Sequence, residues 1–298
     1  MHRIDTPTAQ VDKFGAGKNG FTGGNPQTGE LATALDADFF DSLQEEIAAV
    51  IEAAGITLDK SSNKQLLTSI QKLVSSGRLI GVRVITSSSI YTPTAGTKKI
   101  IVEVQGGGGA GGGSTATTSG NASLGAGGTE GCYAKSQFTS LANSYSVVVG
   151  IGGKGVSGNS GGGGGTTSFG DLVTAGGGYG GAVLPSGTSG LIVGSDGASL
   201  PGVPTVSGAN IESSNFTASY TIGTRLSATL QGSAMAGAGG RSKFGGGGGN
   251  HSTNGAGTSG FSYGSGGAGA KSYSGTSNDT AYVGGNGMDG VVIVWEYA

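Results

Sequence analysis

Runs of glycine dominate residues 86–298 and restrict what this chain can fold into. Of its 66 glycines in 298 residues, nine precede residue 86. Glycine loses more conformational freedom on folding than any other residue, so repeated glycine is unfavourable in ordinary helices and strands. The sequence therefore predicts an architecture in which close approach of backbones offsets this loss. The runs occupy residues 106–113, 161–165, 176–181, 236–240, 245–249 and 264–270.

Two interpretations of these runs remain open. Flexible linkers are commonly rich in glycine, but they do not normally recur between apolar strands inside one unit. The alternative is polyglycine helix in the polyproline-II conformation, with three residues per turn and no internal hydrogen bonds. The backbone N–H and C=O groups must then bond to neighbouring segments. We expect this second arrangement, because it makes use of the missing side chains.

Apolar residues alternate with polar ones between the glycine runs, which predicts β-strands. We expect strands over residues 79–86, 99–105, 145–151 and 291–297, with a turn at residues 93–96. In the last strand, Val291, Ile293, Trp295 and Tyr297 share one face. Residues 78–298 are thus expected to form one glycine-rich domain of strands and polyglycine-II helices. Residues 183–235 contain fewer glycines and fit this pattern poorly.

The first 77 residues are expected to fold differently. Residues 1–37 are polar and turn-rich, which predicts an extended arm that orders against a partner. A helix follows, with Asp38 as its N-cap and Gly55 beyond its C-terminus. A second helix is expected over residues 63–75, opened by a capping box of Ser62 and Gln65.

Apolar residues of the first helix, spaced by three and four, form a stripe over two heptads. The stripe comprises Phe40, Leu43, Ile47 and Val50. This length is too short for a stand-alone coiled coil but suits a small bundle of identical helices over residues 38–77. An intramolecular helical hairpin remains an alternative. The expected fold class is mixed: an extended arm, a short helical bundle, and a region of β-strands and polyglycine-II helices, assembled as a homotrimer.

Charge and composition exclude several classes of function. The net charge of −2 provides no basic field for nucleic acid. No apolar stretch approaches the ~20 residues of a membrane span. The first residues lack a secretory apolar run, so we expect folding in the cytoplasm where the chain is made. Cys132 is the single cysteine, which excludes a disulfide framework and favours a small packed residue. Two histidines and one cysteine predict no metal centre and no cofactor.

Catalytic motifs are weak. Residues 158–162 read GNSGG and fit a nucleophile elbow, but such matches arise by chance in a glycine- and serine-rich chain. A serine hydrolase also needs a base, and His2 and His251 are the available histidines. The acidic residues of the glycine-rich part are isolated in sequence, so no glycosidase pair is visible, although folding could create one. We therefore expect a protein that is not an enzyme.

Three loop segments are rich in Tyr, Ser, Gly and Asn, a composition typical of adaptable binding loops. They are residues 114–135, 250–263 and 271–282. Loops on a rigid scaffold commonly carry recognition, although any one of them could be a solvated connection. We expect the three segments to cluster at one distal surface. The candidate anchors are Tyr133, His251, Phe261, Tyr263, Tyr273 and Tyr282.

Two parts of the chain resemble a known family. Residues 1–10 read MHRIDTPTAQ and residues 13–21 read KFGAGKNGF, followed by QEEI at 44–47 and IEAAGI at 51–56. This stretch resembles the N-terminus of tail fibre proteins from contractile-tailed bacteriophages and prophages. IIVEVQGGGG at 100–109, VVVGIGG at 147–153, TSFG at 167–170 and GMDGVVIVWEY at 287–297 are similar to the glycine-rich C-terminal domain of phage fibres.

The resemblance implies a homotrimeric fibre located in the virion tail, with several partners. Residues 1–37 would attach to a baseplate protein, and a tail fibre assembly chaperone would be a further partner. The distal tip would bind bacterial lipopolysaccharide or an outer-membrane protein. Two rival functions remain: a fibre-borne enzyme that degrades surface polysaccharide, and an ice-binding or matrix protein built from polyglycine helices.

Overall fold

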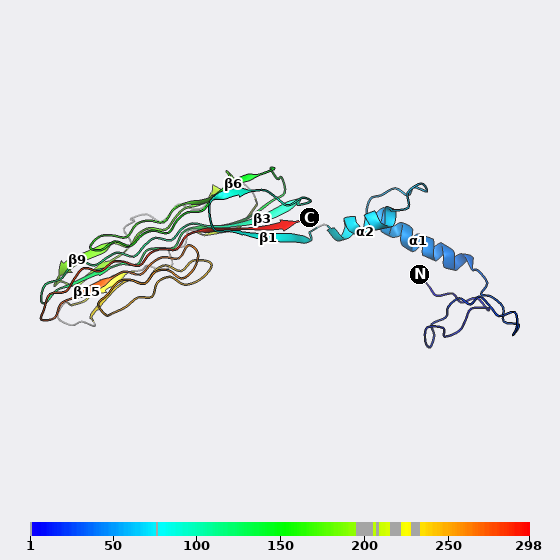
Figure 1. Ribbon diagram of the computed structural model, residues 1–298, viewed down its shortest axis with the longest axis horizontal. Helices are drawn as coiled ribbons and strands as arrows, with labels where there is room; N and C mark the ends of the chain where they lie inside the picture. Colours follow the sequence, from blue (N-terminus) through cyan, green and yellow to red (C-terminus); the bar gives the residue numbers. More distant parts are fainter. Residues whose placement is uncertain (1, 76, 195–204, 207–208, 215–221, 228–232) are drawn as a thin grey trace. The chain divides into compact units, whose positions relative to one another are not determined.

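The computed structural model describes residues 2–75, 77–194, 205–206, 209–214, 222–227 and 233–298 (Figure 1). The chain divides into two compact units, Met1–Arg78 and Leu79–Ala298. We refer to the second as the glycine-rich unit. Among the described residues, α-helices occur in the first unit alone and β-strands in the second alone.

The arm before the first helix is a series of turns tied by short-range bridges. Gln10 pairs with Gly20 and Asn25 pairs with Glu30, so the segment folds back on itself twice. Ile4 is 2% exposed and anchors the beginning of the arm. The predicted turns are therefore present, but the prediction of an extended arm is wrong, because the segment is folded back by local hydrogen bonds of its own.

Helix α1 (Ala37–Ala53) is capped by Asp36, whose side chain accepts a hydrogen bond from the Asp38 backbone N–H. The prediction of Asp38 as the N-cap is wrong by two residues. Asp36 has the extended backbone that an N-cap requires, with φ −122° and ψ 126°. Gly55 follows the helix with φ +67°, as predicted for a C′ glycine.

Helix α2 (Gln65–Ser75) contacts α1 within the same chain, as an intramolecular hairpin requires. The buried side chains of α1 are Ala48 and Ile51. The predicted stripe is not this buried face, because Phe40 is 45% and Ile47 is 39% exposed. One apolar face of α1 is thus used inside the chain and a second is left open.

Two five-stranded antiparallel sheets form one end of the glycine-rich unit, which we call the sandwich end. The first sheet has the order β1 (Leu79–Ile85), β16 (Val291–Tyr297), β3 (Lys99–Gln105), β5 (Tyr133–Phe138), β12 (Ala209–Ser214). The second has the order β11 (Thr205–Val206), β8 (Val173–Ala175), β7 (Thr167–Phe169), β6 (Tyr145–Val148), β2 (Ser89–Tyr91).

The main hydrophobic core lies between these sheets. Val102 and Val104 of β3 and Val294 of β16 are fully buried and pack with Phe169 and Val173 from the second sheet. The strands predicted at residues 99–105 and 291–297 are confirmed. The third predicted strand ends earlier, at Val148, because the chain continues there into a glycine segment.

Two small three-stranded sheets lie at the opposite end of the glycine-rich unit, which we call the distal end (Figure 1). Their orders are β15 (Lys271–Tyr273), β4 (Ala122–Gly125), β9 (Val183–Gly187), and β10 (Leu191–Val193), β13 (Gly223–Arg225), β14 (Ala234–Met235). A second core of Ala122, Leu124, Leu184 and Ala234 holds them together. Within the stretch 183–235, residues 195–204, 207–208, 215–221 and 228–232 lie outside the described residues.

Glycine segments run between the two ends, and their hydrogen bonds repeat every three residues. Successive N–H groups in residues 106–113, the central glycine segment, donate to three different neighbours. The bonds run from Gly109 to Thr129 O, from Ala110 to Gly162 O and from Gly111 to Gly285 O (2.8–2.9 Å). Gly112 then returns to the first neighbour, at Ala126 O (2.8 Å). In a β-sheet, the backbone hydrogen bonds of one strand go to neighbours on two sides. Hydrogen bonds that go to three neighbours in turn are therefore a different arrangement.

The carbonyl groups of the central glycine segment accept hydrogen bonds from other neighbouring segments. Three further segments donate to it, through Gly178, Gly153 and Gly267. The central segment is thus hydrogen-bonded to six neighbouring segments. Side chains have no room there: a Cβ on Gly111 would lie 1.9 Å from Ala268 O, and one on Gly109 would lie 2.0 Å from Tyr179 O. The glycine runs therefore form a tightly packed lattice of backbones.

Candidate functional site

The glycine lattice carries several loops to the distal end. Residues 114–121 leave the central glycine segment, and residues 274–283 follow β15. The two loops are bridged to each other through Ser114 with Tyr282 and Thr117 with Asp279. Because both loops start from hydrogen-bonded segments, their side chains are presented on a fixed base.

Asp279 is the centre of a polar network between these loops. Its Oδ2 accepts from Asn254 Nδ2 (2.6 Å) and Ser272 Oγ (3.1 Å). Its Oδ1 accepts from Tyr282 OH (3.1 Å), and this hydrogen bond is the main cause that raises the pKa of the Tyr282 phenol. Thr117 Oγ1 extends the network to Ser272 (2.9 Å). The carboxylate therefore orients an amide, hydroxyls and a phenol around one point.

Backbone carbonyls hold two basic side chains beside this network. Lys271 is fully buried, and its Nζ donates to Ala234 O (2.6 Å) and to Ser252 O. Burial lowers the pKa of Lys271 to about 8. The ring nitrogens of His251 lie 2.9 Å from Thr253 O and 3.1 Å from Gly269 O. These contacts tie the loop around residues 250–254 to the lattice.

Arg225 fixes a further loop at the distal end. It is 4% exposed, and its guanidinium donates to the carbonyls of Ser189 (2.7 Å), Pro185 (3.0 Å) and Ala122. Burial lowers the pKa of this guanidinium. One side chain thus joins β4, β9 and β13 where their loops emerge.

The six predicted anchors do not share one surface. His251, Tyr273 and Tyr282 lie at the distal end around the Asp279 network. Phe261 and Tyr263 lie at the sandwich end, because the adjacent Gly264 accepts from Gly131, two residues before β5. The expectation of a single cluster is therefore wrong.

Tyr133 is not available as an anchor. It belongs to β5, is 2% exposed, and donates its hydroxyl to Glu103 Oε2 (3.0 Å). Phe244 packs edge-on against its ring, and Lys243 Nζ lies 5.4 Å from the ring centroid. Its position at the end of a loop-like segment made it resemble a binding residue, although the alternation of YAKSQF would have indicated a strand.

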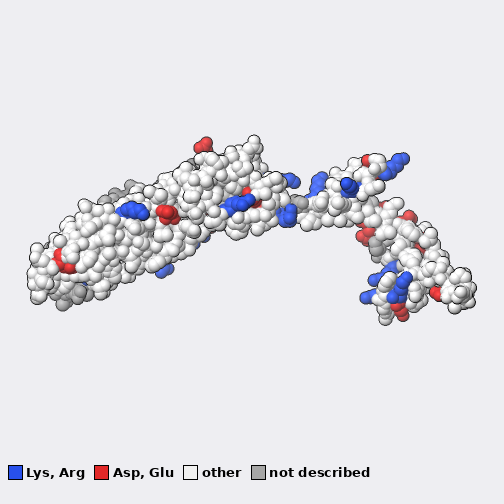
Figure 2. Space-filling view, in the orientation of Figure 1, with Lys and Arg blue, Asp and Glu red and all other residues white. Residues whose placement is uncertain are grey.

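The distal end is suited to hydrogen-bonded recognition. Its partly exposed polar groups include phenols, hydroxyls, amides, one imidazole and the Asp279 carboxylate, and Leu191, Ile192 and Val283 add exposed apolar side chains. Figure 2 shows few charged side chains on the visible face of the glycine-rich unit, so a large charged ligand surface would find little complementarity there. The sequence analysis missed Asp279 and Asn254, because isolated polar residues carry no periodic signal.

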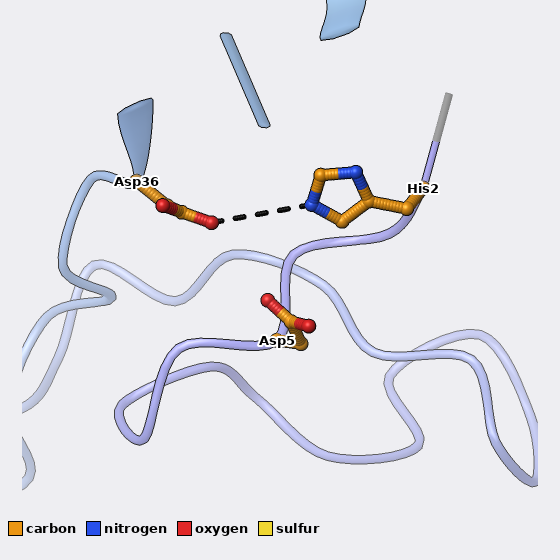
Figure 3. Close-up of side chains that lie close together, drawn as sticks. All are labelled: His2, Asp5 and Asp36. Atoms are coloured by element: carbon orange, nitrogen blue, oxygen red, sulfur yellow. Dashed lines mark ion pairs between the residues drawn. The ribbon is translucent and has the colours of Figure 1, made fainter. Parts of the chain in front are cut away.

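A separate cluster lies in the first unit, where His2, Asp5 and Asp36 approach one another (Figure 3). One ligand atom from each lies within 4.8 Å of the others. His2 Nε2 is 4.0 Å from Asp36 Oδ2. The sequence analysis predicted no metal site from the low number of histidines and cysteines, and it did not consider a set of one histidine and two carboxylates from distant parts of the sequence.

The glycine-rich unit consists of β-sheets at both ends of a glycine lattice. Residues 84–297 match the model of the glycine-rich domain family, and the chain belongs to that family. Among the described residues, no helix has the length and apolar character needed to span a membrane.

A curated relative matches a shorter part of the chain. It is the uncharacterized protein StfP of Escherichia coli (strain K12), which is 65% identical over 74 residues. The matched part is 25% of this chain and 35% of the relative. The chain thus spans about a third of the length of the curated relative that it matches.

Proposed function

We propose that this chain is a tail fibre protein of a bacteriophage or a phage-tail-like particle, with no catalytic activity. Residues 1–37 attach it to a baseplate protein, with help from an assembly chaperone, and the distal end binds a receptor on a bacterial surface. The N-terminal resemblance to tail fibre proteins supports this class. The name of the E. coli relative, StfP, is of the tail-fibre kind.

The observation that carries the proposal is the lattice that joins the sandwich to the distal loops. Its threefold hydrogen-bond repeat and its six-neighbour packing support polyglycine-II helices, which have three residues per turn. Such helices span a distance with few side chains and hold loops at a rigid end. Loops on a rigid scaffold are well suited to recognition.

Exposed apolar side chains support assembly into a homotrimer. Phe40 and Ile47 on α1 and Leu67 and Ile70 on α2 are 39–56% exposed. Short amphipathic helices are marginal in water without a partner. Copies of the chain that pack around a common axis would bury these residues.

The receptor is lipopolysaccharide or an outer-membrane protein, since both are abundant on bacterial surfaces and both offer hydroxyls and amides to the distal groups. The test uses the intact chain, fluorescently labelled, with host cells before and after removal of lipopolysaccharide. Loss of binding identifies lipopolysaccharide, and retained binding that protease treatment of the cells abolishes identifies a protein. The proposal fails if the labelled chain binds no cells of a host that the parent particle adsorbs to.

A further inference from the structure

The cluster of His2, Asp5 and Asp36 brings metal-binding groups together from two distant parts of the first unit. Asp36 caps α1, whereas His2 and Asp5 belong to the beginning of the arm. In Figure 3 the imidazole points toward the Asp36 carboxylate, and the Asp5 carboxylate lies near both. The convergence is a product of the fold, because nothing in the local sequence requires it.

Contacts outside the cluster hold the side chains of His2 and Asp36 and the backbone beside Asp5. Asp36 Oδ1 accepts from Asp38 N (3.3 Å), which leaves Oδ2 directed at His2. The His2 ring packs edge-on against Phe39, with centroids 5.9 Å apart. Ile4, which lies between His2 and Asp5, is almost completely buried. Two of the three ligand groups are thus held near one another before any ion binds, which lowers the entropic cost of binding.

The three side chains do not form hydrogen bonds with one another. The separation of 4.0 Å between His2 Nε2 and Asp36 Oδ2 is too long for a hydrogen bond. In the part of the chain that the structure describes, the Asp5 carboxylate has no hydrogen-bond donor. Two carboxylates beside one imidazole lone pair would be stabilised by a cation between them.

We propose that His2, Asp5 and Asp36 form a binding site for a single Zn²⁺ ion. Imidazole nitrogen and carboxylate oxygen are ordinary zinc ligands, with bonds of about 2.0–2.2 Å. The imidazole disfavours Mg²⁺ and Ca²⁺, which prefer oxygen ligands alone. Binding draws the three side chains together by roughly 1 Å, given those bond lengths. Three protein ligands leave a coordination position open to water.

Zinc at this site would fasten the beginning of the arm to the N-terminus of α1. This inference goes beyond the proposed function and does not depend on it. The bound ion would slow hydrogen exchange of the backbone amides at residues 3–6 and 37–40, because both segments would be joined through one centre. It would leave the glycine-rich unit unchanged.

The test measures zinc binding by the untagged, chelator-treated full chain, using calorimetry together with metal analysis after dialysis. The expected result is one Zn²⁺ per chain and no binding of Mg²⁺ at the same concentration. Asp5→Asn and His2→Gln should each weaken binding at least about tenfold, the scale that loss of even an outer ligand contact produces. Asp36→Asn should do the same while it keeps the helix cap, because Asn caps as well as Asp does.

Two matched controls separate this site from general surface binding. His251→Gln removes the other histidine, and Asp41→Asn removes an exposed carboxylate of α1. Both should bind zinc as the unaltered chain does. The inference is overturned if the chain takes up no stoichiometric zinc, if the three site variants bind as tightly as the controls, or if His251→Gln abolishes binding. Circular dichroism of each metal-free variant checks that the fold is retained.

Discussion

At the scale of single residues, two buried ionisable side chains of the glycine-rich unit differ in their hydrogen-bond partners. The Lys271 ammonium has carbonyl partners in Ala234 and Ser252. Glu130 is 2% exposed, and among the described residues its Oε2 has no hydrogen-bond partner. Burial raises the pKa of Glu130 to about 7. Burial outweighs the one backbone hydrogen bond to this carboxylate, so the group stays neutral at acidic pH and becomes unfavourable when it ionises.

Glu130→Gln should therefore remove a pH dependence of folding. The ordinary pKa of 4.5 describes the unfolded chain, and the folded value of about 7 is higher. In the folded state the Glu130 carboxyl keeps its proton to higher pH than in the unfolded chain. The free energy of unfolding therefore decreases as pH rises from about 4.5 to 7 and stays lower above that. The shift corresponds to about 3 kcal/mol. Urea unfolding should show the variant gaining stability over the wild type by about this amount between pH 4.5 and pH 8.

Glu45→Gln is the matched control, because Glu45 is exposed on α1. It should show no comparable gain. The lowered pKa of Lys271 acts in a separate window, from about 8 to 10.5, and does not interfere. An equal pH response of Glu130→Gln and wild type would show that burial does not raise the pKa of Glu130 in the folded protein.

The two aromatic pairs at opposite ends of the glycine-rich unit provide a direct test of where recognition occurs. Tyr273→Ala with Tyr282→Ala should abolish adsorption of particles to cells, because this pair borders the Asp279 network. Phe261→Ala with Tyr263→Ala should leave adsorption intact, although Phe261 is 73% exposed. Adsorption counts and melting temperatures measured in parallel decide the outcome. If the Phe261 and Tyr263 pair proves essential, the receptor site lies at the sandwich end.

At the scale of elements, the glycine segments differ from every other element because their contacts are between backbones. The central glycine segment has neighbours on six sides, and its packing depends on the absence of Cβ atoms. Protein interiors tolerate added volume poorly, because the surrounding atoms are already close-packed.

Gly111→Ala should strongly destabilise the glycine-rich unit. The new Cβ would lie 1.9 Å from Ala268 O, which is backbone and cannot move without breaking its own hydrogen bond. We expect a loss of about 3 kcal/mol or more, the upper range for overpacking. Gly163→Ala is the control, since its nearest atom would be Gly178 O at 3.4 Å. Unfolding midpoints of the two variants should differ widely, and similar midpoints would mean that the lattice relaxes.

The elements also show what the sequence could and could not predict. Alternation located β3 and β16 to the residue, because each strand has one face in the core. The partners of each glycine segment were unpredictable, because a residue without a side chain carries no pattern that selects a neighbour. The Asp279 network joins residues from three loops, so its members appear isolated in sequence. Tyr133 was misassigned because its strand starts where a glycine segment ends.

At the scale of the whole molecule, the open apolar surface of the first unit predicts self-association. Light scattering of the intact chain should give three times the chain mass of 28.7 kDa. Ile47→Asp should reduce this to the monomer mass, because it places a charge within the exposed stripe. Ala49→Asp, which is exposed on α1 but outside the stripe, should remain a trimer. A monomer for the unaltered chain at micromolar concentration contradicts the prediction.

The lattice also affects how the protein can diverge over evolutionary time. Most positions of the central glycine segment admit no other residue, so selection removes nearly every substitution there. The loops at the distal end begin and end on that lattice, and their sequences can change without disturbing it. Lineages that descend from this chain should therefore keep the spacing of their glycine runs while their distal loops differ in length and composition. New binding preferences can arise by recombination of loops alone, with the framework inherited intact.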